Sequence, residues 1–404
     1  MLVPSWKRTM WILWAGVLLC SASYTMSVPF LPLFLFDLGV QAEAVNLWAG
    51  IVHASAFMVG AFMAPLWGAV ADKYGRKKMV IRAGLSLAII YALIAFVRNP
   101  WELIVVRMLH GLVGGFVPAS MAIVASVAPE NKMGASLGIM QAGTMTGGIL
   151  GPLFGSLLAT WFGQRMSFLV AGGVIFVASL AVIFWVKEGK PAAARSKMKM
   201  REQFRTALHH RPLLSMLLLL LTFQLAFNMI QPLLTLHIAN MKGNVQDAVL
   251  SSGLVFALIG AAGIIASPLW GRTGERRGYR PTLVICLVCA GIMLGIQFFI
   301  DQLWLFVAVQ FVFGLFMAGV VPIVNTLVLR SMGKDFQGRS LGLTASANQL
   351  GGLVGPLAGG LLGYFMDIHW IFLTAGLILI VQGYAVYSSW KKRAADEDEP
   401  LSAS

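Results

Sequence analysis

The charged residues of this chain divide it into long uncharged segments, and these segments limit the possible folds more than any other feature. Twelve runs without Asp, Glu, Lys or Arg are at least 15 residues long, and eleven of them reach 20 residues. They cover residues 9–36, 44–71, 83–97, 108–129, 133–164, 166–186, 212–241, 248–271, 281–300, 302–329, 340–366 and 368–390. An α-helix rises about 1.5 Å per residue, so about 20 apolar residues cross a hydrocarbon core roughly 30 Å thick. The runs predict twelve transmembrane helices, the third of which also needs residues 79–82, with Arg82 reaching the headgroups.

The composition indicates that these helices lie in lipid. Of the 404 residues, 58% are hydrophobic and 11% are charged, whereas soluble domains carry about 25% charged residues. Lipid offers the backbone no hydrogen-bond partners, so only helices or closed barrels span it. Barrel strands would alternate apolar and polar residues, and these runs do not alternate. The expected fold class is an all-α integral membrane protein.

Lysine and arginine are distributed unevenly along the chain, whose formal net charge is +14. If the N-terminus is cytoplasmic and successive helices alternate in direction, 26 of the 30 basic residues fall in cytoplasmic segments. The positive-inside rule accounts for this asymmetry. It predicts a multi-pass protein of the plasma (inner) membrane with both termini in the cytoplasm. Binding to nucleic acid is not needed to explain the charge.

The cysteines indicate neither a disulfide framework nor a metal site. Cys20, Cys286 and Cys289 all fall within predicted spans, where disulfides are not expected. A metal site would need more ligands nearby than the sequence offers. We therefore expect no cofactor and no metal.

The chain contains an internal repeat. Pro65-Leu66-Trp67-Gly68 recurs as Pro268-Leu269-Trp270-Gly271, a shift of 203 residues. The same shift relates other landmarks, and after one inserted residue a shift of 204 relates Gly151-Pro152 to Gly355-Pro356. Parallel repeats of this kind are found in secondary transporters. The repeat predicts a six-helix bundle over 1–187, a cytoplasmic linker over 188–212, and a second six-helix bundle with a short cytoplasmic tail over 213–404.

Several of these motifs resemble the major facilitator superfamily. Residues 68–78, Gly-Ala-Val-Ala-Asp-Lys-Tyr-Gly-Arg-Lys-Lys, resemble its signature loop between helices 2 and 3, and residues 271–280 are a degenerate copy. Residues 107–111 resemble its helix 4 motif, and 147–155, with the partner 351–360, resemble its antiporter motif in helix 5. With Pro29-Phe30-Leu31-Pro32 in helix 1, the resemblance is to the twelve-helix multidrug efflux branch. It implies a drug:proton antiporter that works by alternating access.

The signature loop implies a gate on the cytoplasmic side. In the family, the motif's aspartate contacts the start of helix 11, where the helix dipole favours an anion; here that start falls near Arg339. The resemblance implies that Asp72 closes the cytoplasmic side and that Arg76 braces the loop. An alternative is that the basic residues only fix the topology. The expected gate residues are Gly68, Asp72, Gly75, Arg76 and Glu275.

The glycines of the antiporter motif are spaced by four, so they line one face of helix 5 and allow a neighbouring backbone to approach closely. A proline within the motif removes a hydrogen bond and can kink the helix. The pattern suits a mobile hinge, although simple helix packing would give the same spacing. The expected hinge residues are Gly147, Gly151, Pro152, Gly355 and Pro356.

The groups that would couple transport to protons are harder to assign, because all sixteen acidic residues can be placed in loops, tails or helix ends. Arg107 lies well inside a span, where a charge usually faces the bundle interior; the alternative is that it reaches the outer headgroups. His53 and His110 have a reference pKa near 6.5. The coupling candidates are Arg107, His110, His53, Asp37 and Glu102.

The span residues available to a substrate are mainly aromatic and amide side chains, which suit amphipathic organic molecules. With no acidic residue at mid-membrane, strict selection of dications is not expected. The cavity candidates are Tyr24, Phe30, Gln141, Phe223, Gln224, Phe227, Asn228, Gln231, Asn348 and Gln349.

The sequence therefore favours a secondary active transporter that exports amphipathic drugs in exchange for protons and confers antibiotic resistance. Its expected partners are a small-molecule substrate, protons and membrane lipid, and the family implies a monomer. A carrier for a sugar or other metabolite is the alternative, although its cavity would be more polar. We do not expect an enzyme, because no catalytic set or phosphate-binding loop is visible. A sensor would need a larger soluble domain, and a channel would not need paired gate loops.

Overall fold

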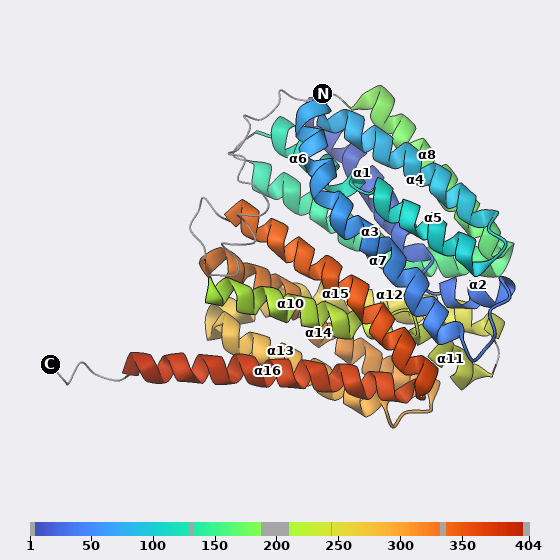
Figure 1. Ribbon diagram of the computed structural model, residues 1–404. Helices are drawn as coiled ribbons and strands as arrows, with labels where there is room; N and C mark the ends of the chain where they lie inside the picture. Colours follow the sequence, from blue (N-terminus) through green and yellow to red (C-terminus); the bar gives the residue numbers. More distant parts are fainter. Residues whose placement is uncertain (1–4, 130–131, 187–209, 244, 332–336, 399–404) are drawn as a thin grey trace. The chain divides into compact units, whose positions relative to one another are not determined.

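The computed structural model describes residues 5–129, 132–186, 210–243, 245–331 and 337–398 (Figure 1). For some residues within helices the backbone alone is described; these are residues 5, 64–65, 68–69, 72–73, 245–246, 337–342 and 392–398. The described residues form helices and contain no strand. The predicted all-α fold class is confirmed.

The helices coincide with the predicted spans. Among the described residues, eleven helical segments are long and apolar enough to cross a membrane, and each lies over one of the uncharged runs. The remaining run, 340–366, lies on α15 (Gln337–Phe365), which is 29 residues long. The chain is thus a multi-pass membrane protein.

The helices divide into two compact units, of which unit 1 holds most of the first half of the chain. Its helices are α1 (Ser5–Met26), α2 (Leu31–Asp37), α3 (Val45–Tyr74), α4 (Arg76–Ala95), α5 (Pro100–Val113), α6 (Phe116–Val127), α7 (Met133–Phe162), α8 (Gln164–Trp185), α11 (Leu234–Lys242) and the part of α12 (Val245–Arg277) up to Ala257. Within the unit, α1 packs along α7, α4 along α8 and α3 along α5.

Unit 2 holds the remaining helices. They are α10 (Arg211–Ile230), the rest of α12, α13 (Tyr279–Gln297), α14 (Leu303–Ser331), α15 and α16 (His369–Asp398). Here α10 packs along α15, and α13 along α16. These pairings repeat α1 with α7 and α4 with α8 in unit 1.

The units differ from the sequence halves in one region, because residues 231–257 group with unit 1. There α11 contacts α2, and the Gly253 backbone lies against the Ser156 side chain, where a Cβ would overlap the hydroxyl. Most of the predicted linker, 188–212, lies outside the described residues. The division at 187 and 213 therefore stays a prediction.

Helix boundaries recur with the shift of the sequence repeat. The first and seventh spans are each interrupted near a proline, Pro29 or Pro232, which has no N–H to donate. The helices resume at Leu31 and at Leu234, which are 203 residues apart. Gly75 and Gly278, which separate α3 from α4 and α12 from α13, have φ of 99° and 93°, a region that favours glycine.

The fourth span is interrupted without a counterpart in the second half. α5 ends at Val113 and α6 begins at Phe116, with Gly115 at φ 114° between them. Arg82 Nη2 donates to the Gly114 carbonyl oxygen at 2.9 Å, and its guanidinium lies 3.4 Å from the Trp67 ring centre. Trp67 Nε1 donates to the Leu112 carbonyl oxygen at 2.6 Å. Trp67 of α3 and Arg82 of α4 therefore donate hydrogen bonds to carbonyl oxygens at the C-terminal end of α5.

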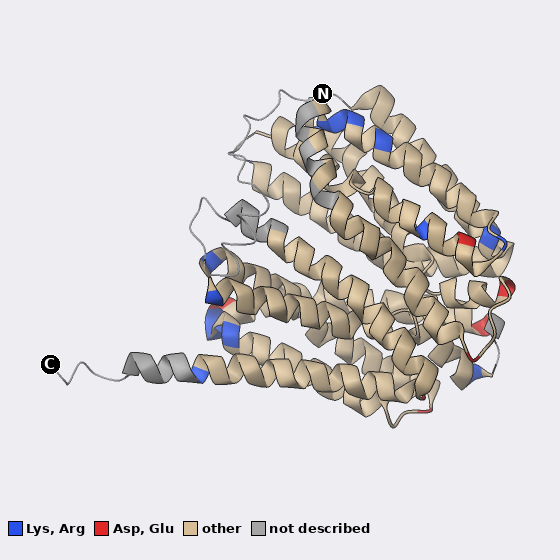
Figure 2. Cartoon of the chain, viewed as in Figure 1, with Lys and Arg blue, Asp and Glu red and all other residues tan. Residues whose placement is uncertain are grey.

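Charged residues gather at the helix ends within each unit, while the helix middles are almost free of them (Figure 2). Large apolar side chains are exposed along the helices instead; Phe62, for example, is 75% exposed and Trp304 is 84% exposed. Such exposure would be unfavourable in water. Exposed apolar helix surface of this extent suits a protein embedded in lipid.

Candidate functional site

A buried polar cluster in unit 1 is built on one face of α5. Asn99 caps the start of this helix, since its Oδ1 accepts from the Glu102 N–H at 2.9 Å. Leu103, Arg107 and His110 are all buried and recur at helical spacing. The side chains of Arg107 and His110 are each 5% exposed, so two polar groups occupy a face that is otherwise apolar.

Arg107 is held by the interruption of the first span. Its Nη2 donates to Ser27 Oγ at 2.9 Å, and Ser27 directly follows the last residue of α1. Its Nε has no hydrogen-bond partner. The prediction that this residue lies inside the bundle is therefore supported by its burial and by its contact, and it does not reach outward as an exposed side chain.

His110 lies between two tyrosines. Its ring centre is 5.3 Å from those of Tyr24 of α1 and Tyr91 of α4, with both pairs edge to face. Tyr91 is buried and its hydroxyl donates to the Ser23 carbonyl oxygen at 2.6 Å, whereas Tyr24 is 41% exposed. His110 Nδ1 has no hydrogen-bond partner.

The half-buried His53 completes the group: it lies on α3, which packs along α5, within electrostatic range of Arg107. We call these residues the Arg107 cluster; its members are Tyr24, Ser27, His53, Tyr91, Arg107 and His110. They come from four helices and one interhelical turn of the same unit. Three of the five coupling candidates thus lie together.

The two carboxylates predicted to assist them are placed elsewhere. Asp37 is exposed at the end of α2. Glu102 is exposed, and its oxygens accept from Asn99 Nδ2 at 2.7 Å and from the Arg98 N–H at 2.8 Å. It therefore forms part of the helix cap. Among the side chains that the structure describes, no carboxylate pairs with Arg107.

The predicted gate residues are described in part. Gly68 and Asp72 lie on α3, and their surroundings fall outside the described part of the structure. Arg76 Nη1 donates to the Ala122 carbonyl oxygen of α6 at 2.8 Å, and Lys77 Nζ donates to the Ile183 carbonyl oxygen of α8 at 2.9 Å. Ile183 lies in the last turn of α8, where the carbonyls lack intrahelical partners and a cation is favourable, whereas Ala122 lies one turn further inside α6. Glu275 is exposed in the last turns of α12.

The glycines of the antiporter motif pack against the first helix of their own half. A Cβ on Gly147, Gly151 or Gly155 of α7 would overlap a carbonyl oxygen of α1, namely that of Leu18, Ala22 or Met26. The same holds for Gly351, Gly355 and Gly359 of α15, which face Leu221, Leu225 and Met229 of α10. Pro152 and Pro356 lie inside continuous helices. The glycines are thus sites of close helix contact, and a hinge role remains a prediction.

The predicted cavity residues differ in accessibility. Phe30 and Phe223 are at most 1% exposed, and Phe30 packs on Phe168 with ring centres 5.3 Å apart. Asn228 is also buried and donates to Gln224 Oε1 at 3.1 Å. The more accessible candidates are Tyr24, Gln141, Gln224, Phe227, Gln231, Asn348 and Gln349.

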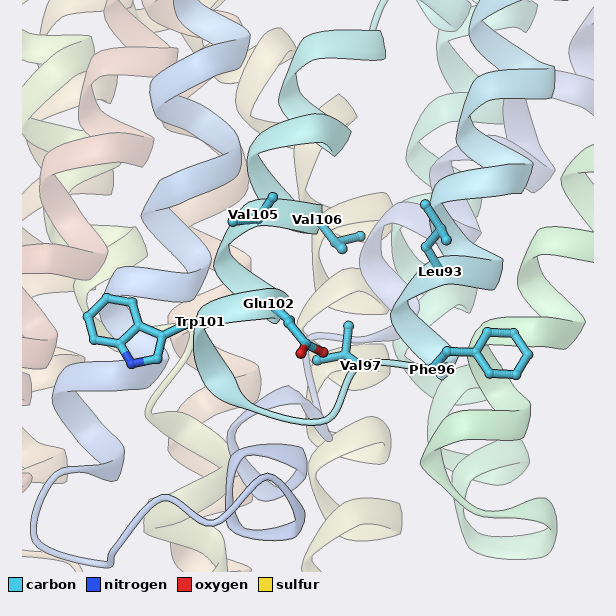
Figure 3. A pocket seen from close by; sticks show the side chains of 7 residues that line it. All are labelled: Leu93, Phe96, Val97, Trp101, Glu102, Val105 and Val106. Carbon is cyan, nitrogen blue, oxygen red and sulfur yellow. The ribbon is translucent and has the colours of Figure 1, made fainter.

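An apolar groove lies between the end of α4 and the start of α5, with a volume of about 460 Å³ (Figure 3). It is lined by Leu93, Phe96, Val97, Trp101, Glu102, Val105 and Val106. Phe96 and Trp101 are each 68% exposed. None of the predicted cavity residues lines this groove, and its one carboxylate belongs to the helix cap. Its position on exposed apolar helix surface suits contact with lipid.

The family model of the Major Facilitator Superfamily matches residues 13–266 and 241–402. The chain belongs to this superfamily. Multidrug resistance protein MdtG of Salmonella arizonae is 32% identical over 396 residues, which cover 97% of this chain and 98% of the relative. MdtG of Salmonella heidelberg matches to the same extent. These relatives confirm the resemblance to the multidrug efflux branch that the motifs predicted.

Solved structures agree on the fold. A bacterial homolog of the human lysosomal transporter Spinster, inward-facing and unoccupied, has a TM-score of 0.80 at 12% identity, with all of both chains covered. A mutant of the nucleoside transporter NupG has a TM-score of 0.78 at 14% identity, covering 94% of this chain and 99% of that one. These structures support the twelve-helix major facilitator fold, and membership of the superfamily makes the chain a transporter.

Several residues around the site of this major facilitator protein were not expected from the sequence. Ser27 and Tyr91 complete the Arg107 cluster, and Arg82 with Trp67 caps the end of α5. Trp67 alone had a visible signal, since it recurs as Trp270 in the repeat. For the other three, the partner lies on another helix, and a single sequence does not reveal such pairings.

Proposed function

We propose that this transporter exports amphipathic drugs or small organic compounds in exchange for protons, by alternating access, as a monomer in the plasma (inner) membrane with both termini cytoplasmic. One observation carries the proposal more than any other. Relatives named multidrug resistance proteins share 32% of their residues with this chain over nearly their full length. The motif loops and glycine faces fit the same function.

The Arg107 cluster is the proposed coupling region. A histidine next to a fixed positive charge changes its proton affinity when the charge moves or becomes neutralised. His110 and His53 both interact electrostatically with Arg107, so a rearrangement of the interrupted first span would alter their affinity for protons. In this proposal Asp37 and Glu102 have no central role, because they are exposed at helix ends.

The gate and the hinge belong to the same proposal. Asp72 would close the cytoplasmic side, with Arg76 holding its loop to α6 through the Ala122 carbonyl. Substrate would contact the accessible aromatic and amide residues, Tyr24 among them. As the hinge, α7 and α15 would bend near Pro152 and Pro356 while their glycine faces keep contact with α1 and α10.

Drug susceptibility tests the function directly. We expect a drug-sensitive strain that expresses the protein to tolerate several-fold more of some amphipathic antibiotics or dyes than the same strain with an empty vector. A protonophore should abolish the difference, and purified protein in liposomes should move the same compounds under an imposed pH gradient. Unchanged susceptibility across a broad panel, together with no transport in liposomes, would contradict the proposal.

A further inference from the structure

Arg107 is a buried cation whose charge has no anionic partner in the described part of the chain. A guanidinium carries five N–H donors and stays charged in proteins, yet here one hydrogen bond, to Ser27 Oγ, is formed. The ion pairs among described residues are those of His369 with Asp301 and Asp367. A buried charge without a partner is strongly unfavourable, so the arrangement favours an anion that comes from outside the chain.

Around Arg107 the described side chains include no anion, and His110 adds a ring nitrogen without a partner. His110, 5% exposed, has an unpartnered Nδ1, while the Tyr91 hydroxyl is already engaged with the Ser23 carbonyl. Tyr24, the exposed aromatic member of the cluster, stands edge to face with His110. The cluster thus combines an unpaired cation with an accessible aromatic ring, which suits a molecule with one acidic group and an apolar body.

We propose that the Arg107 cluster binds the carboxylate of acidic amphipathic substrates, with Arg107 as the charge partner and Tyr24 against the apolar part. This inference rests on the proposed function and specifies one of its substrate classes. A carboxylate would accept two N–H groups of the guanidinium side by side, which is the geometry that arginine favours.

Matched fluorescent probes test the inference. Pyrenebutyrate and pyrenebutanol share their ring and chain and differ in the terminal carboxylate. Their binding is measured by energy transfer from tryptophan to pyrene, with the protein in lipid nanodiscs and empty nanodiscs as background. We expect wild-type protein to bind the carboxylate about tenfold more tightly than the alcohol, as suits one added charge-assisted pair.

Variants then locate the preference. Arg107→Gln should bind the carboxylate no more tightly than the alcohol, whereas Arg107→Lys should retain part of the preference. Arg98→Gln is the matched control, because Arg98 is exposed just before α5, and it should behave as wild type. If Arg107→Gln fails to fold, Tyr24→Cys offers a second measurement, since pyrenebutyrate should protect the new thiol from a maleimide more than pyrenebutanol does.

A wild-type protein that binds both probes equally would overturn the inference, and so would a preference that survives in Arg107→Gln. Both results are binding measurements that say nothing against efflux of neutral compounds, so they are distinguishable from failure of the proposed function, which drug susceptibility measures. Loss of affinity for both probes in a folded Arg107→Gln variant would also count against it, since it would assign Arg107 a structural role.

Discussion

At the scale of single residues, the glycines of α7 give the sharpest prediction. A side chain on Gly151 would overlap the Thr25 hydroxyl and the Ala22 carbonyl oxygen of α1, while a Cβ on Gly148 of the same helix would meet nothing within 4 Å. We expect Gly151→Leu to lower the melting temperature and to abolish efflux, because overpacking costs about 1–3 kcal/mol or more. Gly148→Leu should retain both. Thermal unfolding in detergent and drug susceptibility measure the effect, and equal behaviour of the two variants would contradict it.

The residue scale also shows what the sequence could predict of the site. Arg107, His110 and His53 were identifiable because a charged or titratable side chain inside an apolar run stands out. Ser27 and Tyr91 were not, since serine and tyrosine are common in spans and their roles depend on which helices meet. Glu102 looked available as a proton carrier, but the capping role of its carboxylate became visible once Asn99 and the Arg98 N–H were placed.

At the scale of elements, the interruption between α5 and α6 yields a comparison of two tryptophans. Trp67 donates to the Leu112 carbonyl in the last turn of α5, and Trp270 donates to the Leu315 carbonyl inside the continuous helix α14. The first carbonyl lacks an intrahelical partner and the second has one. We expect Trp67→Phe to lower the free energy of unfolding by about 1–3 kcal/mol, because the Leu112 carbonyl would lose its hydrogen-bond partner. Trp270→Phe should lower it by less.

Melting temperatures of the two variants in the same detergent check this expectation. If the melting temperature fell more in Trp270→Phe than in Trp67→Phe, the stability of the C-terminal end of α5 would not depend on the hydrogen bond from Trp67. The cap itself was hidden in the sequence: Arg82 looked like a residue that reaches the headgroups, whereas it stacks on Trp67 and binds the Gly114 carbonyl.

At the scale of the whole molecule, the charge distribution predicts the topology. The described cations of unit 2 gather where α12 ends and α13 begins, near Arg276 and Arg280 (Figure 2). The positive-inside rule predicts that these ends face the cytoplasm. A green fluorescent protein fused to either terminus should therefore fluoresce, and alkaline phosphatase fused at the same points should be inactive. Active phosphatase at one terminus would contradict an even number of spans.

The overall fold was largely predictable, because the length of the spans, the uncharged runs and the repeat can all be recognised without knowing which helices are in contact. The interruptions of the spans were harder to predict. Pro29 and Pro232 were visible in the sequence but were not interpreted as helix ends, and the interruption at Gly114-Gly115 contains no proline. The grouping of residues 231–257 with unit 1 depends on contacts such as Gly253 with Ser156, which join segments about a hundred residues apart and leave no local pattern.

The uncompensated guanidinium of Arg107 has one more consequence, for ions that are not cargo. A fixed positive charge surrounded by low-dielectric protein creates a potential that repels Na⁺ and K⁺, as single arginines do in narrow water pores. Even when water enters unit 1 during a transport cycle, inorganic cations meet this barrier. A transporter built in this way carries its cargo without an accompanying leak of these cations.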